Sequence, residues 1–451
     1  MQNSTDGRPV HSPAFRRRRA LNWLPLGLTY AFLYMARYNL TVSKNALGTL
    51  MSKEAFGIIF AVGTVTYAVS FLLNGPLTDK IGGKRAILIG AGGSALMNAT
   101  MGLILYGILA LGWSLNLTVA FSIVYALNMY FQSYGAVAIV KVNASWFHVR
   151  ERGTFGGIFG ILISLGLYFA FDWSQAIVNF TEQMNPENPQ YWLVFFIPAA
   201  ILLFWLILDI LALRDSPSLA GYADFNTGDA SSGEADTPFR VKDILRRIFT
   251  NKVILVVGMI EFCTGVLRNG VMHWFSIFAK EQIAAAPGFA GQWNFWLNNW
   301  GLMLMLAGAS GGMLAGWMSD HLFQSRRAPV AGILYTILLL ATIGMTFTLY
   351  GNPMVLGSIV SVVSIAVIGT HGVLSGTATM DFGGRKAAAT AVGLIDGLVY
   401  LGTGLQSLAL GFITTWNWQF WPVFLIPFAV TGIILTSRIW YAIPKGKTAV
   451  R

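Results

Sequence analysis

The sequence predicts an all-α integral membrane protein with twelve transmembrane helices, arranged as two pseudo-symmetric six-helix bundles. Of its 451 residues, 55% are hydrophobic and only 11% are charged, whereas soluble proteins carry about a quarter charged residues. Apolar runs of membrane-spanning length recur along the whole chain, and a polar stretch near the middle divides them into six and six. An ordinary soluble enzyme is therefore excluded, and most of the chain is expected to lie in a lipid bilayer.

Each of the twelve segments holds about 20 predominantly apolar residues, the length that an α-helix needs to cross the hydrocarbon core. The first segment follows a polar tail and is too long for the apolar core of a signal peptide, so we expect it to stay attached. The predicted segments span residues 20–42, 56–78, 86–110, 115–142, 154–180, 190–213, 252–280, 295–319, 328–350, 353–380, 386–413 and 419–442.

The basic residues alternate between the two sides of these segments. Most of the 30 Lys and Arg residues fall in the tails and in every second loop, and the opposite side has only Lys44, Lys53 and Lys280. Because basic loops are retained in the cytoplasm, this asymmetry predicts that both termini are cytoplasmic. It also explains the net charge of +11 without nucleic acid as a partner.

Composition sets the predicted domain limits. Residues 214–251 form the longest polar stretch and are rich in Ser, Gly, Asp and Pro, as linkers are. The predicted order is a cytoplasmic tail (1–19), an N-terminal bundle (20–213), a cytoplasmic linker (214–251), a C-terminal bundle (252–442) and a second tail (443–451). Short loops favour a bacterial inner membrane; a monomer is implied only by the family resemblance described below.

Several classes of function lack the residues they need. The lone Cys263 lies in an apolar run, which excludes a disulfide framework, a Cys-based zinc site and an iron–sulfur cluster. The glycines at 90–93 lie within an apolar segment with no preceding strand, so they are no nucleotide loop, and no Walker A pattern occurs. We therefore expect no metal, no cofactor and no enzymatic activity.

The two halves share a motif between their second and third segments. Gly75, Asp79 and Arg85 recur at the same spacing as Gly316, Asp320 and Arg326. Parallel repeats with a pathway between the halves are typical of secondary transporters. These carboxylates and arginines are predicted to form charge pairs that break and re-form as the halves rock; a static clasp of the loop is the alternative.

This motif resembles the loop motif of the major facilitator superfamily, G-x-x-(S/T)-D-x-x-G-(R/K)-(R/K). Within that superfamily the chain looks like the organophosphate:phosphate antiporters, which include glycerol-3-phosphate and hexose-phosphate transporters. The closer resemblance is carried by five stretches: Tyr30–Asn39, Trp146–Gly153, Gly265–Trp274, Gly316–Asp320 and Arg385–Gly402.

Two arginines fall inside predicted membrane helices at corresponding places in the two halves. A charged side chain at the centre of such a helix costs about 2.5–3.5 kcal/mol, so Arg37 and Arg268 require compensation. Facing each other across the pseudo-twofold axis, they would form a cationic site at the midplane. Guanidinium groups bind phosphate oxygens in bidentate fashion. The resemblance implies that both arginines clamp the phosphate group of the substrate.

Other candidate binding residues surround this pair. Tyr30 and Tyr34 share a helical face with Arg37 because they precede it by about two turns and one turn, and their hydroxyls could donate to phosphate or sugar oxygens. The resemblance adds Tyr67 and Tyr400 as cavity tyrosines and Lys141 as a basic cavity residue. For Lys141, snorkelling to the lipid headgroups is the alternative.

Two acidic residues inside membrane segments are candidates for coupling. Glu261 lies two turns before Arg268, about 10 Å along a helix axis. It is predicted to be either a counter-ion for Arg268 or a proton site, because a low dielectric disfavours the charged carboxylate. Asp396 admits the same two interpretations. The residues His273, His371, Asp172 and Asp209 are expected to be structural.

The chain departs from the glycerol-phosphate members of the resembled family at three polar cavity positions, where it has Phe71, Ile163 and Met305. The predicted function is alternating-access antiport of a phosphorylated small molecule, of glycerol-phosphate, sugar-phosphate or phosphoglycerate type, against inorganic phosphate. The alternative is a proton-coupled carrier of another organic anion or an amphipathic compound. A membrane sensor on the same fold is a third possibility.

Overall fold

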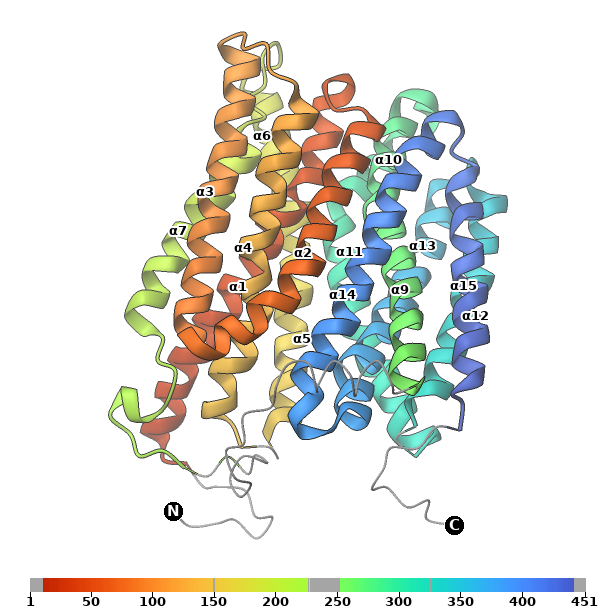
Figure 1. Cartoon of the computed structure of the whole chain (residues 1–451). Coiled ribbons are helices and arrows are strands. Elements are labelled where there is room, and N and C mark those ends of the chain that lie inside the picture. Colours follow the sequence, from red (N-terminus) through yellow and green to blue (C-terminus); the bar gives the residue numbers. More distant parts are fainter. Residues whose placement is uncertain (1–10, 149–150, 226, 228–251, 325, 442–451) are drawn as a thin grey trace.

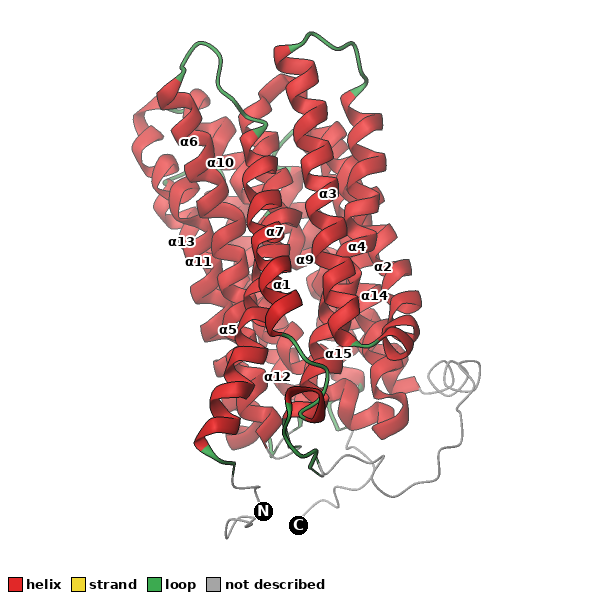
Figure 2. Ribbon diagram, turned by 90° about the vertical axis from the view of Figure 1, so that its left-hand side faces the viewer, coloured by secondary structure: helices red, strands yellow, loops and turns green. Residues whose placement is uncertain are grey.

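The computed structural model describes residues 11–148, 151–225, 227, 252–324 and 326–441, and within them all side chains except those of 152–159 and 376–394. Every regular element in these ranges is a helix (Figures 1 and 2). The N-terminal half contains α1 (Pro13–Leu47), α2 (Lys53–Ile81), α3 (Gly83–Ala110), α4 (Leu117–Trp146), α5 (Arg152–Tyr168), the π-helical turn η3 (Phe169–Trp173), α6 (Ser174–Met184) and α7 (Leu193–Ala212).

The C-terminal half begins after the linker. It contains α9 (Lys252–Met272), α10 (Trp274–Ala285), α11 (Ala290–Trp317), α12 (Arg327–Thr348), α13 (Pro353–His371), α14 (Thr379–Trp416) and α15 (Phe420–Arg438). Two π-helical turns extend these helices, η7 (Met318–Leu322) after α11 and η8 (Gly372–Ala378) between α13 and α14. The 3₁₀ turns are η1 (Gly48–Leu50), η4 (Ser218–Ala220) and η6 (Pro287–Phe289).

Eleven helical segments of the described chain are long and apolar enough to cross a membrane. The predicted all-α membrane fold is confirmed. The helix α1 is not among the eleven, although it runs alongside them (Figure 1). Its polar residues explain why: Arg37, Asn39, Thr41 and Asn45 reduce its hydropathy, yet all four side chains are buried. Protein rather than lipid surrounds these groups, so α1 lies in the interior of the bundle.

One predicted helix boundary is wrong. The apolar pattern places a short loop at 381–385, but helix continues through η8 into α14, which begins at Thr379. Polar residues mark where a helix leaves the lipid, and the backbone hydrogen bonds can continue beyond that point. With 38 residues, α14 is about 57 Å long and exceeds the roughly 30 Å hydrocarbon core. Its apolar portion, from Ile395 to Trp416, satisfies the criterion for a span.

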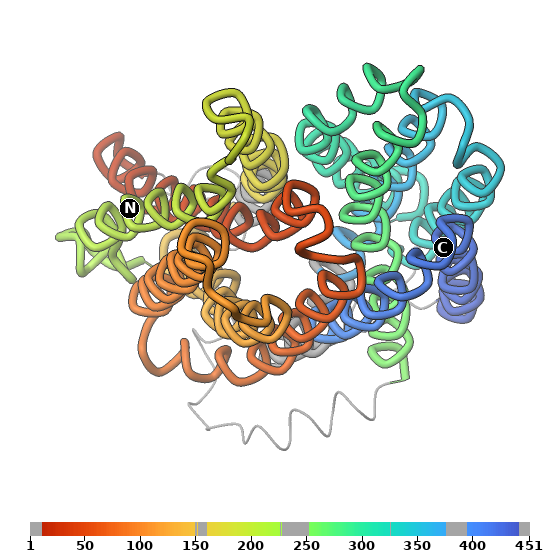
Figure 3. The backbone as a smooth tube through the Cα atoms, turned by 90° about the horizontal axis from the view of Figure 1, so that it is seen from above, coloured from red at the N-terminus to blue at the C-terminus, as the bar shows by residue number. Residues whose placement is uncertain are grey.

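The two halves lie side by side, with α2 next to α14 and α5 next to α11 at their boundary (Figure 3). Glycine permits the closest approach. A Cβ atom on Gly57 would lie 2.5 Å from the Ser407 carbonyl oxygen and 3.0 Å from the Gly411 Cα atom. Small residues at such positions let membrane helices pack backbone to backbone. At the same boundary α1 lies next to α10.

Polar contacts also join the halves. We call the end of the bundle with η1 and the α3–α4 loop the hairpin end, and the end where α9 begins the linker end; they are uppermost and lowermost in Figure 1. The contacts are Thr41 to His273 (2.7 Å), Asn45 to Ser276 (2.9 Å), Lys53 to Glu281 (3.1 Å), Asn179 to Asn298 (3.0 Å) and the Asp172 carboxylate to the Gly301 N–H (2.6 Å). Among the described side chains, these contacts lie between the bundle centre and the hairpin end, which is therefore tied together.

Candidate functional site

The Arg37 side chain is completely buried at the centre of the bundle. Its Nε and Nη2 atoms donate to the Gln132 amide oxygen at 3.2 and 3.1 Å, and Nη1 donates to the Tyr400 hydroxyl at 3.0 Å. The first contact is to α4 of the same half and the second crosses to α14. Among the described residues no carboxylate forms an ion pair with Arg37. Its charge is held by neutral acceptors.

Gln132 is fixed in turn by a network of buried polar groups. Its Nε2 atom donates to the Leu33 carbonyl and to Ser94 Oγ, both at 2.9 Å. Ser94 donates to the Asn128 amide oxygen at 2.6 Å, and Asn128 donates to the Ala36 carbonyl at 3.0 Å. These bonds join α1, α3 and α4 and leave the Gln132 oxygen aimed at Arg37. The sequence analysis missed Gln132.

Aromatic rings surround the Arg37 guanidinium. Its Cζ atom lies 4.9 Å from the centroid of Tyr34, 4.6 Å from Tyr67 and 5.7 Å from Tyr38. Cations are attracted to ring faces at such distances. The Tyr67 and Tyr400 rings approach each other at 4.3 Å across the boundary, so α2 and α14 both contribute to this enclosure.

Arg268 of α9 shares tyrosine neighbours with Arg37. Its side chain is half-buried, and its electrostatic neighbours include Tyr38, Tyr400 and Tyr34. These three tyrosines are also neighbours of Arg37. Within the described part of the chain, Arg268 has no carboxylate in ion-pair contact. Glu261 and Asp396 interact with Arg268 only at longer range. Two guanidinium groups that share three tyrosines and form no described ion pair make a site suited to an anion.

Tyr30 and Phe71 lie in a second layer, behind the tyrosines that contact Arg37. The Tyr30 ring packs edge-on against Tyr34 with centroids 5.4 Å apart, one layer behind it. Phe71 packs against Tyr67 with a centroid separation of 5.7 Å. The apolar residue at this position therefore extends the aromatic wall.

The structure does not place Lys141 at the arginines. Its Nζ atom forms an ion pair with Asp79 Oδ1 at 2.7 Å, where α4 and α2 approach the linker end; the Lys141 side chain is partly exposed and that of Asp79 is mostly exposed. An exposed Lys at a helix end reaches a nearby carboxylate more readily than a buried cavity. The placement disagrees with a role in binding the substrate at this site.

The motif charges also pair differently from the prediction. Asp320 pairs with Arg327 at 3.1 Å, whereas Arg326 donates to the Phe323 carbonyl. Arg85 is exposed, and the Asp79 partner is Lys141. Both ion pairs therefore lie within one half instead of crossing between halves. Equal spacing in the sequence identified the carboxylates but not their cations, because the partner depends on which way each helix end faces.

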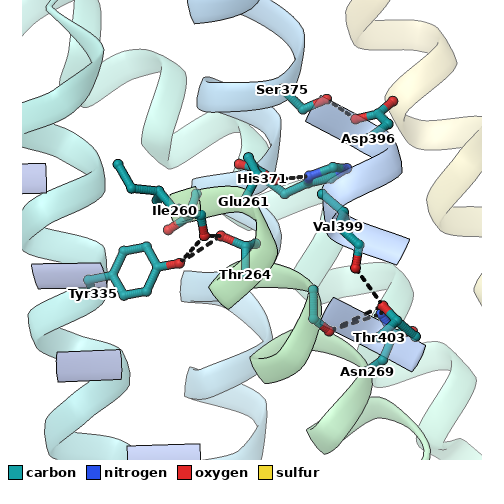
Figure 4. A network of polar contacts seen from close by, with 12 residues as sticks. Ile260, Glu261, Thr264, Asn269, Tyr335, His371, Ser375, Asp396, Val399 and Thr403 are labelled. Carbon is teal, nitrogen blue, oxygen red and sulfur yellow. Dashed lines mark hydrogen bonds and ion pairs between the residues drawn. The ribbon is translucent and has the colours of Figure 1, made fainter. Parts of the chain in front are cut away.

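Glu261 is completely buried, and its Oε2 atom lies 2.7 Å from Nδ1 of His371 in α13. Arg268 interacts with Glu261 at longer range, so both predicted interpretations of Glu261, a counter-ion and a proton site, remain predictions. Asp396 accepts a hydrogen bond from Ser375 at 2.5 Å beside this pair (Figure 4). His371, which was expected to be structural, is thus part of the acidic cluster.

The sequence profile of the Major Facilitator Superfamily matches residues 26–407, and the chain belongs to this superfamily. A glycerol-3-phosphate transporter of Bacillus subtilis (strain 168) is 25% identical over 95% of this chain and 93% of that protein. A hexose-6-phosphate:phosphate antiporter of Escherichia coli (strain K12) is 26% identical, covering 87% and 82%. The membrane sensor protein UhpC of the same organism is 23% identical, covering 91% and 90%.

Solved structures agree with this assignment at the level of the fold. A bacterial homologue of the human lysosomal transporter Spinster, in an inward-facing and unoccupied conformation, superimposes with a TM-score of 0.73 at 15% identity, covering 97% of this chain and 100% of that chain. The resemblance to organophosphate transporters noted from the sequence is confirmed. The relatives are membrane transporters and a membrane sensor, and the protein is not an enzyme.

Proposed function

We propose that the protein is an alternating-access antiporter that exchanges a phosphorylated small organic molecule for inorganic phosphate. The substrate is of glycerol-phosphate, sugar-phosphate or phosphoglycerate type. The observation that carries this proposal is that Arg37 and Arg268 share Tyr34, Tyr38 and Tyr400 and have no described carboxylate as an ion-pair partner. The names of the relatives, a glycerol-3-phosphate transporter and a hexose-6-phosphate:phosphate antiporter, support the same class of substrate.

We call Arg37 and Arg268 together the clamp. A phosphate group bound there replaces neutral hydrogen-bond acceptors. In the structure the Tyr400 hydroxyl accepts from Arg37 Nη1; a phosphate oxygen at this place is itself charged, so it adds ion-pair attraction to the hydrogen bond. Arg268 supplies the second fork from the opposite half. The ligand therefore draws the two halves together, since each half contributes one guanidinium.

Obligatory exchange follows from the cost of the empty site. An arginine without an ion-pair partner at the membrane centre costs about 2.5–3.5 kcal/mol, so an empty carrier crosses its transition state slowly. A bound phosphate or phosphate ester pairs directly with both arginines and permits the movement. The carrier then returns only with another phosphorylated ligand, which links uptake of the organic substrate to release of phosphate.

The proposed setting is the inner membrane of a bacterium. The distribution of basic residues favours a cytoplasmic location for the linker end and both termini. Since the hairpin end is tied together by contacts such as Thr41 to His273, the clamp in this structure is expected to be reached from the cytoplasmic side. Opening of the hairpin end would require those contacts to separate.

The test is exchange in proteoliposomes. Vesicles containing the purified protein are loaded with unlabelled phosphate, and uptake of radiolabelled external phosphate is followed with and without glycerol 3-phosphate, glucose 6-phosphate or a phosphoglycerate. We expect rapid exchange that one of these esters inhibits. Absence of exchange, with folded protein in the vesicles, would contradict the antiporter. Saturable phosphate binding without any exchange would indicate a sensor.

A further inference from the structure

The phosphate clamp leaves one buried pair of titratable residues without a role. Glu261 has no exposed surface, while the side chain of its partner His371 is 24% exposed. The second carboxylate oxygen of Glu261, Oε1, is buried and has no hydrogen-bond partner. A buried carboxylate oxygen without a donor is costly. The pair therefore combines a concealed acceptor with an imidazole that reaches a more open region.

The groups around this pair come from every helix packed against it. On α9 itself they are Arg268 and Cys263; α13 contributes His371 and α14 contributes Asp396, which Ser375 of η8 holds. The Tyr335 hydroxyl of α12 is directed to Thr264 and the Ile260 carbonyl (Figure 4). Of the other neighbouring helices, α15 has Arg438 at its end and α10 has Lys280 and Glu281 in its second half, while α11, which packs against α13, has no charged residue.

The charges of these residues balance only while the clamp is empty. The two arginines contribute two positive charges, and Glu261 and Asp396 contribute two negative ones when His371 is neutral. A bound phosphate group adds one or two negative charges in a region of low dielectric, where an uncompensated charge is expensive. An additional positive charge must therefore enter with it.

We propose that Glu261 and His371 form a proton-binding site that is loaded when a phosphate group enters the clamp, so that phosphate and proton cross the membrane together. This inference rests on the proposed antiporter function. In the empty state Nδ1–H of His371 donates to the Glu261 carboxylate. The proton arrives at Nε2 of His371, and the pair gains one positive charge whichever side of the Nδ1···Oε2 hydrogen bond holds the proton. A phosphate monoanion and one proton together leave the site neutral.

A proton fits this position better than a cationic group on the substrate. The Oε1 atom of Glu261 has no accessible surface, so an ammonium group cannot reach it, whereas a proton can pass through the imidazole. The geometry also assigns separate tasks: the partly exposed His371 receives the proton, and the buried Glu261 stabilises the added charge.

Isothermal titration calorimetry measures this proton directly. Inorganic phosphate is titrated into the purified full-length protein in two buffers of equal pH and different ionisation enthalpy, which gives the number of protons taken up per phosphate. Any change in the protonation of phosphate itself is common to all variants. We expect the wild type to take up about one proton more than Glu261→Gln or His371→Gln. The control Asp209→Asn, which alters a buried carboxylate bonded to Thr29 on other helices, should match the wild type.

Equal proton uptake by wild type and Glu261→Gln would overturn the proposal, as would tighter binding of phosphoethanolamine than of phosphate without proton uptake. If the variants do not fold, infrared difference spectra of the wild type provide the test instead. Addition of phosphate should change an imidazolium band or a protonated carboxylic acid band. Absence of such a change would refute the proton site. Phosphate exchange at equal internal and external pH is measured in parallel. Phosphate exchange without proton uptake would contradict the proton site but not the antiporter. Absence of both phosphate binding and exchange would contradict the antiporter function.

Discussion

The Arg37 guanidinium in α1 donates a hydrogen bond to the Tyr400 hydroxyl in α14, 3.0 Å away. This bond joins the two halves of the molecule at the centre of the bundle. Its donor is a permanent cation and its acceptor is neutral, so a phosphate oxygen at the same place would bind Arg37 more strongly. The bond therefore marks where we expect the substrate to enter the clamp.

Replacing Gln132 should weaken phosphate binding without removing a charge. In Gln132→Leu, two donors of Arg37 lose their acceptor, and the guanidinium is no longer held toward the enclosure. Hydrogen bonds to charged groups contribute about 1.5–3 kcal/mol, so we expect phosphate affinity to fall roughly tenfold or more. The measurement is the dissociation constant for inorganic phosphate. Gln190→Leu, at an exposed loop position, is the control; equal affinities in the two variants would refute this role.

A glycine at the boundary between the halves gives a stability prediction. A Cβ atom on Gly301 would lie 2.8 Å from Asp172 Oδ1 and 2.9 Å from the Tyr168 carbonyl oxygen, so Gly301→Ala should disturb the contact between η3 and α11. Overpacking costs about 1–3 kcal/mol, and we expect a lower thermal unfolding temperature. Gly312→Ala on the same helix meets nothing within 4 Å. It should be neutral or stabilising by up to about 1 kcal/mol, and equal effects would contradict the packing argument.

An ion pair beyond the membrane helices predicts a dependence of stability on pH. Burial alone would raise the pKa of Glu151, but its hydrogen bonds and charge interaction with Arg19, 3.0 Å away, lower that pKa below its usual value of 4.5. Because the folded-state pKa is depressed, the stabilisation is complete above pH 4.5 and is lost as the pH falls through the lower folded value.

The matched variant is Glu151→Gln. At pH 7 it should unfold more easily than the wild type by about 1 kcal/mol, the order expected of a partly buried charge-assisted bond. The difference should shrink as the pH is lowered below 4.5. A difference that stays constant between neutral and acidic pH would show that the charge of Glu151 is not responsible.

The His273 ring contacts the opposite half of the molecule at the hairpin end and helps to hold the two halves together. This side chain of the C-terminal half packs against Tyr38, Phe60 and Phe171 of the N-terminal half, with ring centroids 4.9, 4.5 and 5.8 Å away. In His273→Ala the hairpin end should open more often, because the ring contacts and the Thr41 hydrogen bond are lost. Spin labels at the exposed positions Leu115 and Trp416 should report longer distances by electron paramagnetic resonance. The control His321→Ala, at an exposed position, should leave these distances unchanged. If the distance distribution is also unchanged in His273→Ala, His273 does not hold the hairpin end closed.

Much of the architecture and part of the site could be predicted from the sequence. Apolar runs report the lipid environment directly, and the cost of a membrane-buried charge singles out Arg37 and Arg268 because lipid excludes such groups. Tyr34 shares a helical face with Arg37, so helical spacing alone placed it near the guanidinium. These inferences need no knowledge of how distant helices pack.

The partners of these charges could not be predicted in the same way. Gln132 is 95 residues from Arg37, and His371 is 110 residues from Glu261; each contact depends on how two helices face each other. An amide or imidazole in an apolar run is compatible with simple packing, and no spacing rule distinguishes it. Lys141 shows the same limit, since its pairing with Asp79 depends on the relative position of two helix ends.

A double-mutant cycle on the two arginines tests the central claim most directly. The dissociation constant for inorganic phosphate is measured for the wild type, Arg37→Lys, Arg268→Lys and the double variant, with the exposed Arg438→Lys as control. Lysine keeps the charge but loses the fork geometry, so each single variant should bind at least about tenfold more weakly. Because both arginines hold one phosphate, the double variant should lose less than the two effects combined, by more than about 0.5 kcal/mol. Wild-type affinity in either single variant, or fully additive losses, would contradict a shared clamp.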